Sequence, residues 1–213
     1  MQPEVKICGL TREEDAALAG RLGAAYVGTI LAESPRRITP DRARAIFAAA
    51  PGARGVCVFG RATPADIADA AEAAGASVVQ LHGDYSLAAV NEVRNRFAGE
   101  VWVVAKVSDT LRLPDELLEV ADALVLDTAD AVRLGGTGRG FDWTIASRAL
   151  EIGTRPRKLV LAGGLRPSNV GGAISQLHPD VLDVSSGVES STGIKDPALL
   201  SAFVEAVGRS DDR

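Results

Sequence analysis

Short β-branched apolar runs alternate along this chain with longer alanine-rich segments, and this alternation limits the fold more than any other feature. The runs predict strands, and the segments between them carry apolar residues at helical spacing. The strand candidates are residues 5–8, 26–31, 55–59, 77–81, 101–107, 123–127, 158–162 and 181–184, each followed by a helix candidate. Such pairs, mostly without hairpin signals, favour a parallel sheet with crossover helices. The sequence therefore predicts an α/β protein, a (βα)8 TIM barrel forming a single domain over residues 1–213.

Several predicted helices have a start signal. Thr39 and Thr63 each precede a proline, and Thr11 precedes a pair of glutamates. A threonine oxygen can accept from the first free amides of a helix, and proline suits its first turn. We expect a further start around Pro167 and a short fifth helix after Leu113.

An open doubly wound sheet is the alternative architecture. Its dinucleotide-binding form needs a Gly-x-Gly-x-x-Gly turn after the first strand, but here that strand ends in Cys8-Gly9-Leu10-Thr11. The glycine-rich residues 135–140 miss this spacing because Phe141 occupies the last required position, and no Walker-type Gly-Lys-Ser/Thr motif is present. These observations argue against a nucleotide cofactor.

Composition excludes several classes of protein. The 213 residues are 46% hydrophobic, and a net charge of −5 gives no general attraction to nucleic acid or to an anionic membrane. No apolar stretch approaches the roughly 18 residues of a membrane span, and no signal peptide is visible, so we expect a cytoplasmic location. Two cysteines within apolar runs predict reduced thiols, and His82 and His178 are too few for a zinc pattern, so no metal is expected.

Two proton-transfer groups end apolar runs that are far apart in sequence. Cys8 shares a strand face with Lys6, and Asp127 shares one with Val125. In a parallel barrel both would point inward at the carboxyl ends of the strands, where such folds keep their chemistry. Alternatively, Cys8 is a small buried hydrophobe, which is our interpretation of Cys57, and Asp127 caps a loop.

Glycines and serines after the last two strands predict a phosphate site. Gly163 and Gly164 follow the seventh strand, and Ser186 and Gly187 follow the eighth, where barrels commonly gather amides around a phosphate. Ordinary turn chemistry is the alternative for either pair taken alone.

Two further side chains are candidates for substrate binding. Arg36 lies just past the second strand, where a guanidinium could hold a carboxylate through two hydrogen bonds. The alternative is a solvated loop arginine, and composition does not separate Arg36 from Arg37. His82 could support the rim of the barrel or simply cap a strand, and we favour the supporting role.

Several motifs together resemble those of the phosphoribosylanthranilate isomerase family. They occur in order and cover nearly the whole chain, which makes the set specific although each motif alone is weak. The motifs are Lys6-Ile7-Cys8-Gly9-Leu10-Thr11, Gln80-Leu81-His82-Gly83, Leu126-Asp127-Thr128, Gly135-Gly136-Thr137-Gly138 with Phe141-Asp142-Trp143, Ala162-Gly163-Gly164-Leu165 with Asn169-Val170, and Asp183-Val184-Ser185-Ser186-Gly187-Val188-Glu189 with Gly193 and Lys195-Asp196.

The resemblance implies a (βα)8 enzyme of tryptophan biosynthesis without cofactor or metal. It would convert N-(5-phosphoribosyl)anthranilate into the 1-deoxyribulose 5-phosphate derivative by an Amadori rearrangement. The implied roles are Cys8 as general base, Asp127 as general acid, Arg36 rather than Arg37 for the substrate carboxylate, Asp183 for its amine, and Gly163, Gly164, Ser186 and Gly187 for its phosphate. Thr29 and Leu31 replace aromatic residues common in the family, which puts the packing around the anthranilate ring in question.

The chemistry itself requires an acid and a base. Ring opening needs a proton at the ribose ring oxygen, and the resulting imine must lose a proton from the adjacent carbon. Asp127 must therefore hold a proton, and Cys8 must reach the thiolate from a reference pKa of about 8.5, so both titrations should be shifted.

Two other functions remain in view. One is the related aminoaldose-phosphate isomerase of histidine biosynthesis, disfavoured because those enzymes typically end the first strand with Asp. The other is a catalytically silent phosphate-binding barrel, disfavoured because it has no use for both Cys8 and Asp127. The expected partner is a small-molecule substrate, and monomer and homodimer both remain open.

Overall fold

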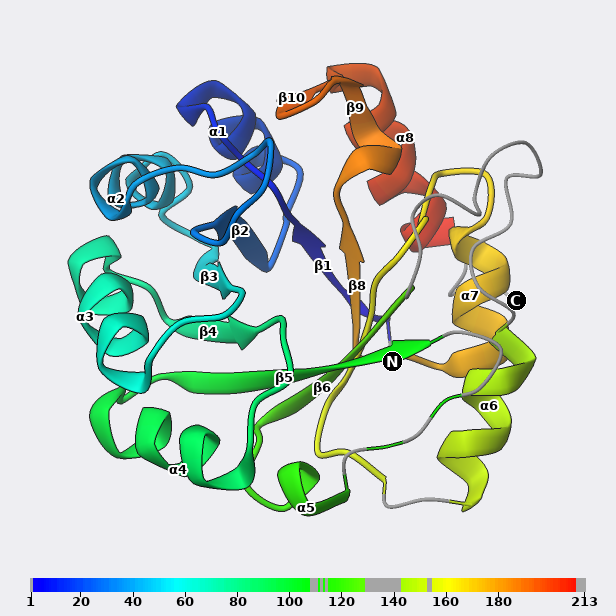
Figure 1. The fold of residues 1–213 in the computed structure, drawn as a ribbon. Coiled ribbons are helices and arrows are strands. Elements are labelled where there is room, and N and C mark those ends of the chain that lie inside the picture. The colour runs from blue at the N-terminus through cyan, green and yellow to red at the C-terminus, as the bar shows by residue number, and fades with distance from the viewer. Residues whose placement is uncertain are drawn as a thin grey trace.

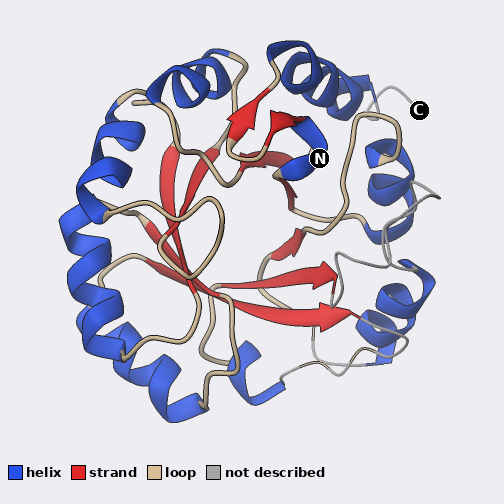
Figure 2. Ribbon diagram, turned by 45° about the horizontal axis from the view of Figure 1, so that its top comes forward, coloured by secondary structure: helices blue, strands red, loops and turns tan. Residues whose placement is uncertain are grey.

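Eight parallel strands close into a barrel in the order β1 to β8, and helices α1 to α8 surround it (Figures 1 and 2). The structure is a computed structural model that describes residues 2–107, 111, 113, 115–128, 143–152 and 155–209. Each strand pairs with its neighbour in sequence, and β1 pairs with β8 to complete the ring. The predicted (βα)8 TIM barrel is confirmed.

The strands follow the apolar runs closely. They are β1 (Glu4–Ile7), β2 (Tyr26–Ile30), β3 (Arg54–Phe59), β4 (Val78–Leu81), β5 (Glu100–Val107), β6 (Ala123–Thr128), β7 (Leu159–Leu161) and β8 (Val181–Val184). The helices are α1 (Glu13–Arg21), α2 (Pro40–Ala48), α3 (Pro64–Ala74), α4 (Leu87–Arg96), α5 (Asp115–Leu118), α6 (Trp143–Ile152), α7 (Val170–Leu177) and α8 (Pro197–Gly208). Among the described helices, none combines the length and apolar character needed to cross a membrane.

Strand parity divides the core into two clusters. In β6, Ala123 and Val125 belong to a cluster inside the barrel with Trp102, whereas Leu124 and Leu126 belong to the larger cluster between the strands and the helices. Side chains alternate between the two faces of a strand, so Asp127 shares the inward face of Val125.

Two of the predicted helix starts form as expected. The side-chain oxygen of Thr39 accepts a hydrogen bond from the Arg42 amide at the start of α2, and Thr63 accepts one from the Asp66 amide at the start of α3. α1 also begins where the third signal predicted, at Glu13, but Thr11 does not cap it: Arg12 is the N-cap residue, and the Thr11 hydroxyl donates to another segment. α5 has four residues, which confirms that the fifth helix is short.

A short antiparallel hairpin beyond β8 is an addition that the sequence did not predict. It consists of β9 (Glu189–Ser191) and β10 (Ile194–Lys195), and it lies beside α1 and α8 (Figure 1). The Thr11 hydroxyl donates to the Gly193 carbonyl at 2.6 Å, and the Lys195 amide donates to the Asp15 carboxylate at 3.0 Å. These hydrogen bonds fix the hairpin to the first βα unit.

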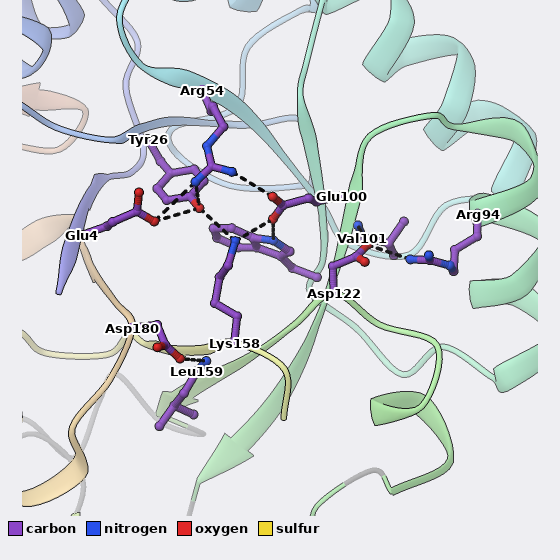
Figure 3. A network of polar contacts seen from close by, with 11 residues as sticks. Glu4, Tyr26, Arg54, Arg94, Glu100, Val101, Asp122, Lys158, Leu159 and Asp180 are labelled. Carbon is purple, nitrogen blue, oxygen red and sulfur yellow. Dashed lines mark hydrogen bonds and ion pairs between the residues drawn. The ribbon is translucent and has the colours of Figure 1, made fainter. Parts of the chain in front are cut away.

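A network of charged and aromatic side chains occupies the amino-terminal mouth of the barrel (Figure 3). Its centre is Glu100, at the start of β5, which accepts hydrogen bonds from Arg54 at 2.8 Å, Lys158 at 3.0 Å and the Trp102 indole at 2.8 Å. Lys158 also donates to the Tyr26 hydroxyl at 3.1 Å. This network closes the end of the barrel that faces away from the predicted site.

We expect Glu100 to make stability depend on pH. Burial raises the pKa of Glu100, but hydrogen bonds from Trp102 and Lys158 and the charges of Lys158 and Arg54 outweigh it and lower the pKa. The stabilisation is therefore present above the unfolded-state pKa and is lost as pH falls through the lower folded-state pKa. Glu100→Gln should remove up to about 1 kcal/mol of unfolding free energy at neutral pH and much less at about pH 3.

Urea denaturation at a series of pH values measures this effect. Glu92→Gln is the matched control, because Glu92 pairs with Arg96 on the exposed face of α4. Equal pH dependence for Glu100→Gln and the parent protein would contradict the assignment.

Candidate active site

Cys8 lies at the carboxyl end of β1, inside the mouth of the barrel. Its amide donates to the Val184 carbonyl at 2.9 Å, and the residue is only 7% exposed. A Cβ atom placed on Gly28 would lie 2.9 Å from the Cys8 sulfur, so the thiol lies against the inner face of β2. Cys57, in contrast, contacts Thr29 in the cluster between strands and helices, as expected for a core thiol.

A buried lysine lies next to Cys8. Lys6 is fully buried, and its ammonium donates to the Asp183 carboxylate at 2.6 Å and to the Gln80 side chain at 2.8 Å. Oδ1 of Asp183 is also buried and has no hydrogen-bond partner among the described residues. Sequence reasoning placed Lys6 on the inward face but gave neither Lys6 nor Gln80 a role. Both are polar residues within otherwise apolar strands, and this pattern could have indicated a role in the site.

The predicted shift of the Cys8 thiol towards the thiolate was wrong in direction. Burial raises the pKa of Cys8 because it disfavours the charged form. The positive charge of Lys6 opposes this increase, the negative charge of Asp183 adds to it, and Lys195 opposes it again. Burial exceeds the opposing charges, so the thiol is protonated over a wider range of pH than an exposed cysteine.

Asp127 and His82 meet on another part of the same mouth. Asp127 is the penultimate residue of β6, and His82 directly follows β4. Nε2 of His82 lies 3.7 Å from Oδ2 of Asp127, and both side chains are partly exposed. The contact fits the predicted supporting role of His82 at the rim.

Parallel strands place all these side chains at one mouth. Cys8, Lys6 and Asp183 come from β1 and β8, and Asp127 and His82 come from β6 and the end of β4. In a ring ordered β1 to β8, the first group faces the second across the opening. A ligand in this mouth would therefore lie between a thiol and a carboxylate.

Arg36 is held by a carboxylate of the protein itself. Its guanidinium donates to both oxygens of Glu189, at 2.8 and 2.6 Å, and the ammonium of Lys195 donates to Glu189 at 2.9 Å. Burial raises the pKa of Glu189, but Arg36 and Lys195 outweigh it and lower the pKa, so Glu189 stays ionised. Two cations share one anion, which leaves net positive charge beside the mouth.

The position of Arg36 next to the thiol depends on Gly9. Gly9 has φ +69°, and a Cβ atom there would lie 2.7 Å from Cδ of Arg36. The absence of a side chain lets the arginine pass directly over the residue after Cys8. Arg37, which composition could not separate from Arg36, is exposed.

The two predicted phosphate loops touch each other. Gly163 and Gly164 both have positive φ, 84° and 67°, which only glycine adopts readily. A Cβ atom on Gly187 would overlap the Leu165 carbonyl oxygen, so the loop after β8 packs against the loop after β7. Ser186 begins the short helix η2 (Ser186–Val188), whose first amides make no helical hydrogen bonds.

Three further predictions concern the glycine-rich motif, the two residues that depart from the family pattern, and metal binding. The motif over residues 135–138, with Phe141 and Asp142, lies outside the described residues. Thr29 and Leu31 pack in the cluster between strands and helices, or against it, so their departure from the family pattern does not alter the inner wall of the mouth. The described residues contain no group of three His, Cys, Asp or Glu side chains that could hold a metal ion.

We predict that Gly28→Ala lowers kcat/KM by at least about tenfold, because small displacements of reacting groups are costly. The new methyl group would lie 2.9 Å from the Cys8 sulfur and 3.1 Å from Cε of Lys6, so both must move. Gly52→Ala is the matched control, since a Cβ atom there meets nothing within 4 Å. The test is steady-state kinetics on samples whose folded fractions are shown to be equal by circular dichroism. An unchanged kcat/KM for Gly28→Ala would refute the placement of the thiol.

Comparison with known proteins identifies the family of this chain. A family model described as N-(5'phosphoribosyl)anthranilate (PRA) isomerase matches residues 5–206. N-(5'-phosphoribosyl)anthranilate isomerase of Pseudomonas fluorescens Pf-5 is 37% identical over 209 residues, covering 97% of this chain and 96% of the relative. The crystal structure of phosphoribosyl anthranilate isomerase from Thermus thermophilus superposes with a TM-score of 0.84 at 35% identity, covering 97% of this chain and 98% of that one.

A second solved structure includes a ligand. It is phosphoribosyl anthranilate isomerase in complex with reduced 1-(o-carboxyphenylamino)-1-deoxyribulose 5-phosphate, with a TM-score of 0.80, 32% identity, and coverage of 97% and 99% of the two chains. The family match and the relatives both extend over nearly the whole chain. This chain therefore belongs to the N-(5'-phosphoribosyl)anthranilate isomerase family.

Proposed function

We propose that this protein isomerises N-(5'-phosphoribosyl)anthranilate to 1-(2-carboxyphenylamino)-1-deoxyribulose 5-phosphate in tryptophan biosynthesis. The observation that carries the proposal is the placement of Cys8 and Asp127 across one barrel mouth in a member of this family. One barrel domain over residues 1–213 supplies every group in the scheme, so the same scheme holds for a monomer and a homodimer.

Asp127 acts first, as general acid. It gives a proton to the ribose ring oxygen as the bond between that oxygen and C1 breaks, and the anthranilate nitrogen supplies the electron pair that forms the imine. His82, 3.7 Å from Asp127, supports the carboxyl group at the rim. The products of this step are an open-chain protonated imine and an ionised Asp127.

Cys8 acts second, as general base. Its thiolate removes the proton from C2, and the electrons move into a C1–C2 double bond to give an enolamine. Transfer of the C2 hydroxyl proton and protonation of C1 then give the ketone, so the overall reaction gains and loses no atoms. Only the ionised thiol can accept this proton, which makes the charge around Cys8 part of the chemistry.

The substrate has three groups that match features of the mouth. The net positive charge of Arg36, Lys195 and Glu189 suits the anthranilate carboxylate, which the free N–H groups of Arg36 would bind. Oδ1 of Asp183, buried and unbonded among the described residues, suits the anthranilate N–H. Gly163, Gly164, Ser186 and Gly187 would bind the phosphate through backbone amides. Holding both ends fixes the reacting carbons between acid and base.

We predict that Cys8→Ser and Asp127→Asn each lower kcat by about 10²-fold to 10⁴-fold, because each removes one proton-transfer step. The loss of anthranilate-type fluorescence from freshly generated phosphoribosylanthranilate measures turnover. Cys57→Ser is the matched control, because Cys57 faces the helices. This variant should turn over substrate as fast as the parent protein.

Three results would count against the proposal. If both variants turn over substrate as fast as the parent, the roles are wrong. A parent protein that binds phosphate ligands without turnover would be a silent barrel. A parent that processes only the histidine-pathway aminoaldose would be the related isomerase.

We predict that Arg36→Lys raises KM for phosphoribosylanthranilate by about tenfold or more, since a lysine cannot bind a carboxylate through two parallel hydrogen bonds. Arg37→Lys makes the same change on the exposed neighbouring residue and should leave KM within about twofold. Equal KM values for the two variants would contradict the assignment of the carboxylate to Arg36.

A further inference from the structure

Lys6 is a charged group that the reaction scheme leaves without a task. It lies in the middle of β1, is 0% exposed, and belongs to the barrel interior. Burying an ammonium is costly unless the charge is paired and hydrogen-bonded. Lys6 meets this requirement with two acceptors, Asp183 and Gln80, contributed by β8 and β4.

The lysine also lies close to the proposed base. A Cβ atom on Gly28 would lie 2.9 Å from the sulfur of Cys8 and 3.1 Å from Cε of Lys6, so both side chains converge over this glycine. Lys6 therefore lies close to the thiol as well as to the carboxylate of Asp183, and its interactions with Cys8 act to lower the pKa of the thiol. Lys6 is placed where its charge acts on both groups.

We propose that Lys6 is a positioning residue that provides the fixed positive charge needed for ionisation of the Cys8 thiol and holds Asp183 in place for the substrate amine. This inference rests on the proposed function, because it assumes that the Cys8 thiolate is the base. Its electrostatic part, however, concerns the free protein and can be measured without substrate.

Four charged groups act on Cys8 from the elements packed around it. They are Lys6 on β1, Asp183 on β8, Lys195 on β10 and Arg36 after β2. Arg36 and Lys195 are both paired with Glu189, which offsets much of their charge. Asp183 is an anion and opposes the thiolate. The charge of Lys6 is thus the largest effect that opposes the increase in the Cys8 pKa caused by burial.

The test is the pH dependence of alkylation at Cys8 in the absence of substrate. Iodoacetamide reacts with the thiolate, and peptide-resolved mass spectrometry separates Cys8 from Cys57. Burial raises the pKa of Cys57 to about 12, so Cys57 contributes little below that pH. In Lys6→Met the midpoint for Cys8 should rise by at least about 1 pH unit, because the opposing charge is gone.

Gln80→Leu is the matched control. It removes the other hydrogen-bond acceptor of Lys6 and keeps the positive charge, so the midpoint should move by less than about 0.3 pH unit. If Lys6 had only a structural role, the alkylation midpoint of Cys8 would shift by a similar amount in Lys6→Met and in Gln80→Leu. Equal shifts in the two variants, or no shift in Lys6→Met, would overturn the proposal.

Two further variants keep the test decisive if Lys6→Met does not fold. Asp183→Asn removes the anion and should move the Cys8 midpoint to lower pH, opposite to the effect of Lys6→Met. The double variant with Lys6→Met and Asp183→Asn leaves no unpaired buried charge. Its midpoint should lie above that of the parent, because the lysine acts on Cys8 more strongly than the aspartate does. A double variant that titrates like the parent would overturn the inference.

Kinetics separate this inference from the proposed function. In Lys6→Met the acidic limb of kcat/KM against pH should move upward with the alkylation midpoint, so part of the lost activity returns at high pH. If the midpoint moves but the parent does not turn over phosphoribosylanthranilate, the proposed function fails and the effect of Lys6 on the thiol stands. If the parent is active and the midpoint stays, the inference about Lys6 fails alone.

Discussion

The first and last strands of the barrel are joined by a buried ion pair. Lys6 and Asp183 are direct partners in the ladder between β1 and β8, and their side chains meet at 2.6 Å although 177 positions separate them in sequence. Either charge alone would be costly inside the barrel. The pair exists only when the sheet is closed, so closing the barrel and assembling the inner wall of the mouth are one event.

The charges around this pair explain how a nearly buried thiol can take part in proton transfer. Burial acts against ionisation of Cys8, and the cations close to it act in the opposite direction. On the outer side of the thiol, Arg36 and Lys195 share Glu189 and retain net positive charge. These cations suit both an anionic base and an anionic ligand, so recognition and chemistry draw on the same set of charges.

The sequence predicted those features that depend on local pattern. Strand order, the inward face of Asp127 and the caps at Thr39 and Thr63 follow from periodicity and from residues three or four positions apart. Tertiary contacts were not predictable in this way. The Thr11 hydroxyl donates to Gly193 rather than capping α1, and Nε and Nη2 of Arg36 donate to Glu189, which is 153 positions away.

The ionisation of Cys8 was mispredicted for a related reason. The role of general base required a thiol that ionises readily, and the structure instead encloses Cys8 between β2 and β8. Burial depends on how the neighbouring strands pack, which local sequence does not reveal. Strand alternation placed Lys6 on the same face as Cys8. Its role could not be predicted, however, because the sequence does not show that Lys6 and Asp183 are partners in the ladder between β1 and β8.

The polar network around Glu100 (Figure 3) lies at the starts of the strands, whereas the thiol and the phosphate loops follow the strand ends. The ion pairs of Glu100 with Arg54 and Lys158 form at the starts of the strands, and the reacting groups lie at the strand ends. Ion pairs at the amino-terminal end can therefore be gained or lost without touching the reacting atoms. Adaptation of such a scaffold to a hotter or colder habitat could therefore proceed by substitutions at one end, while selection for catalysis acts on the other.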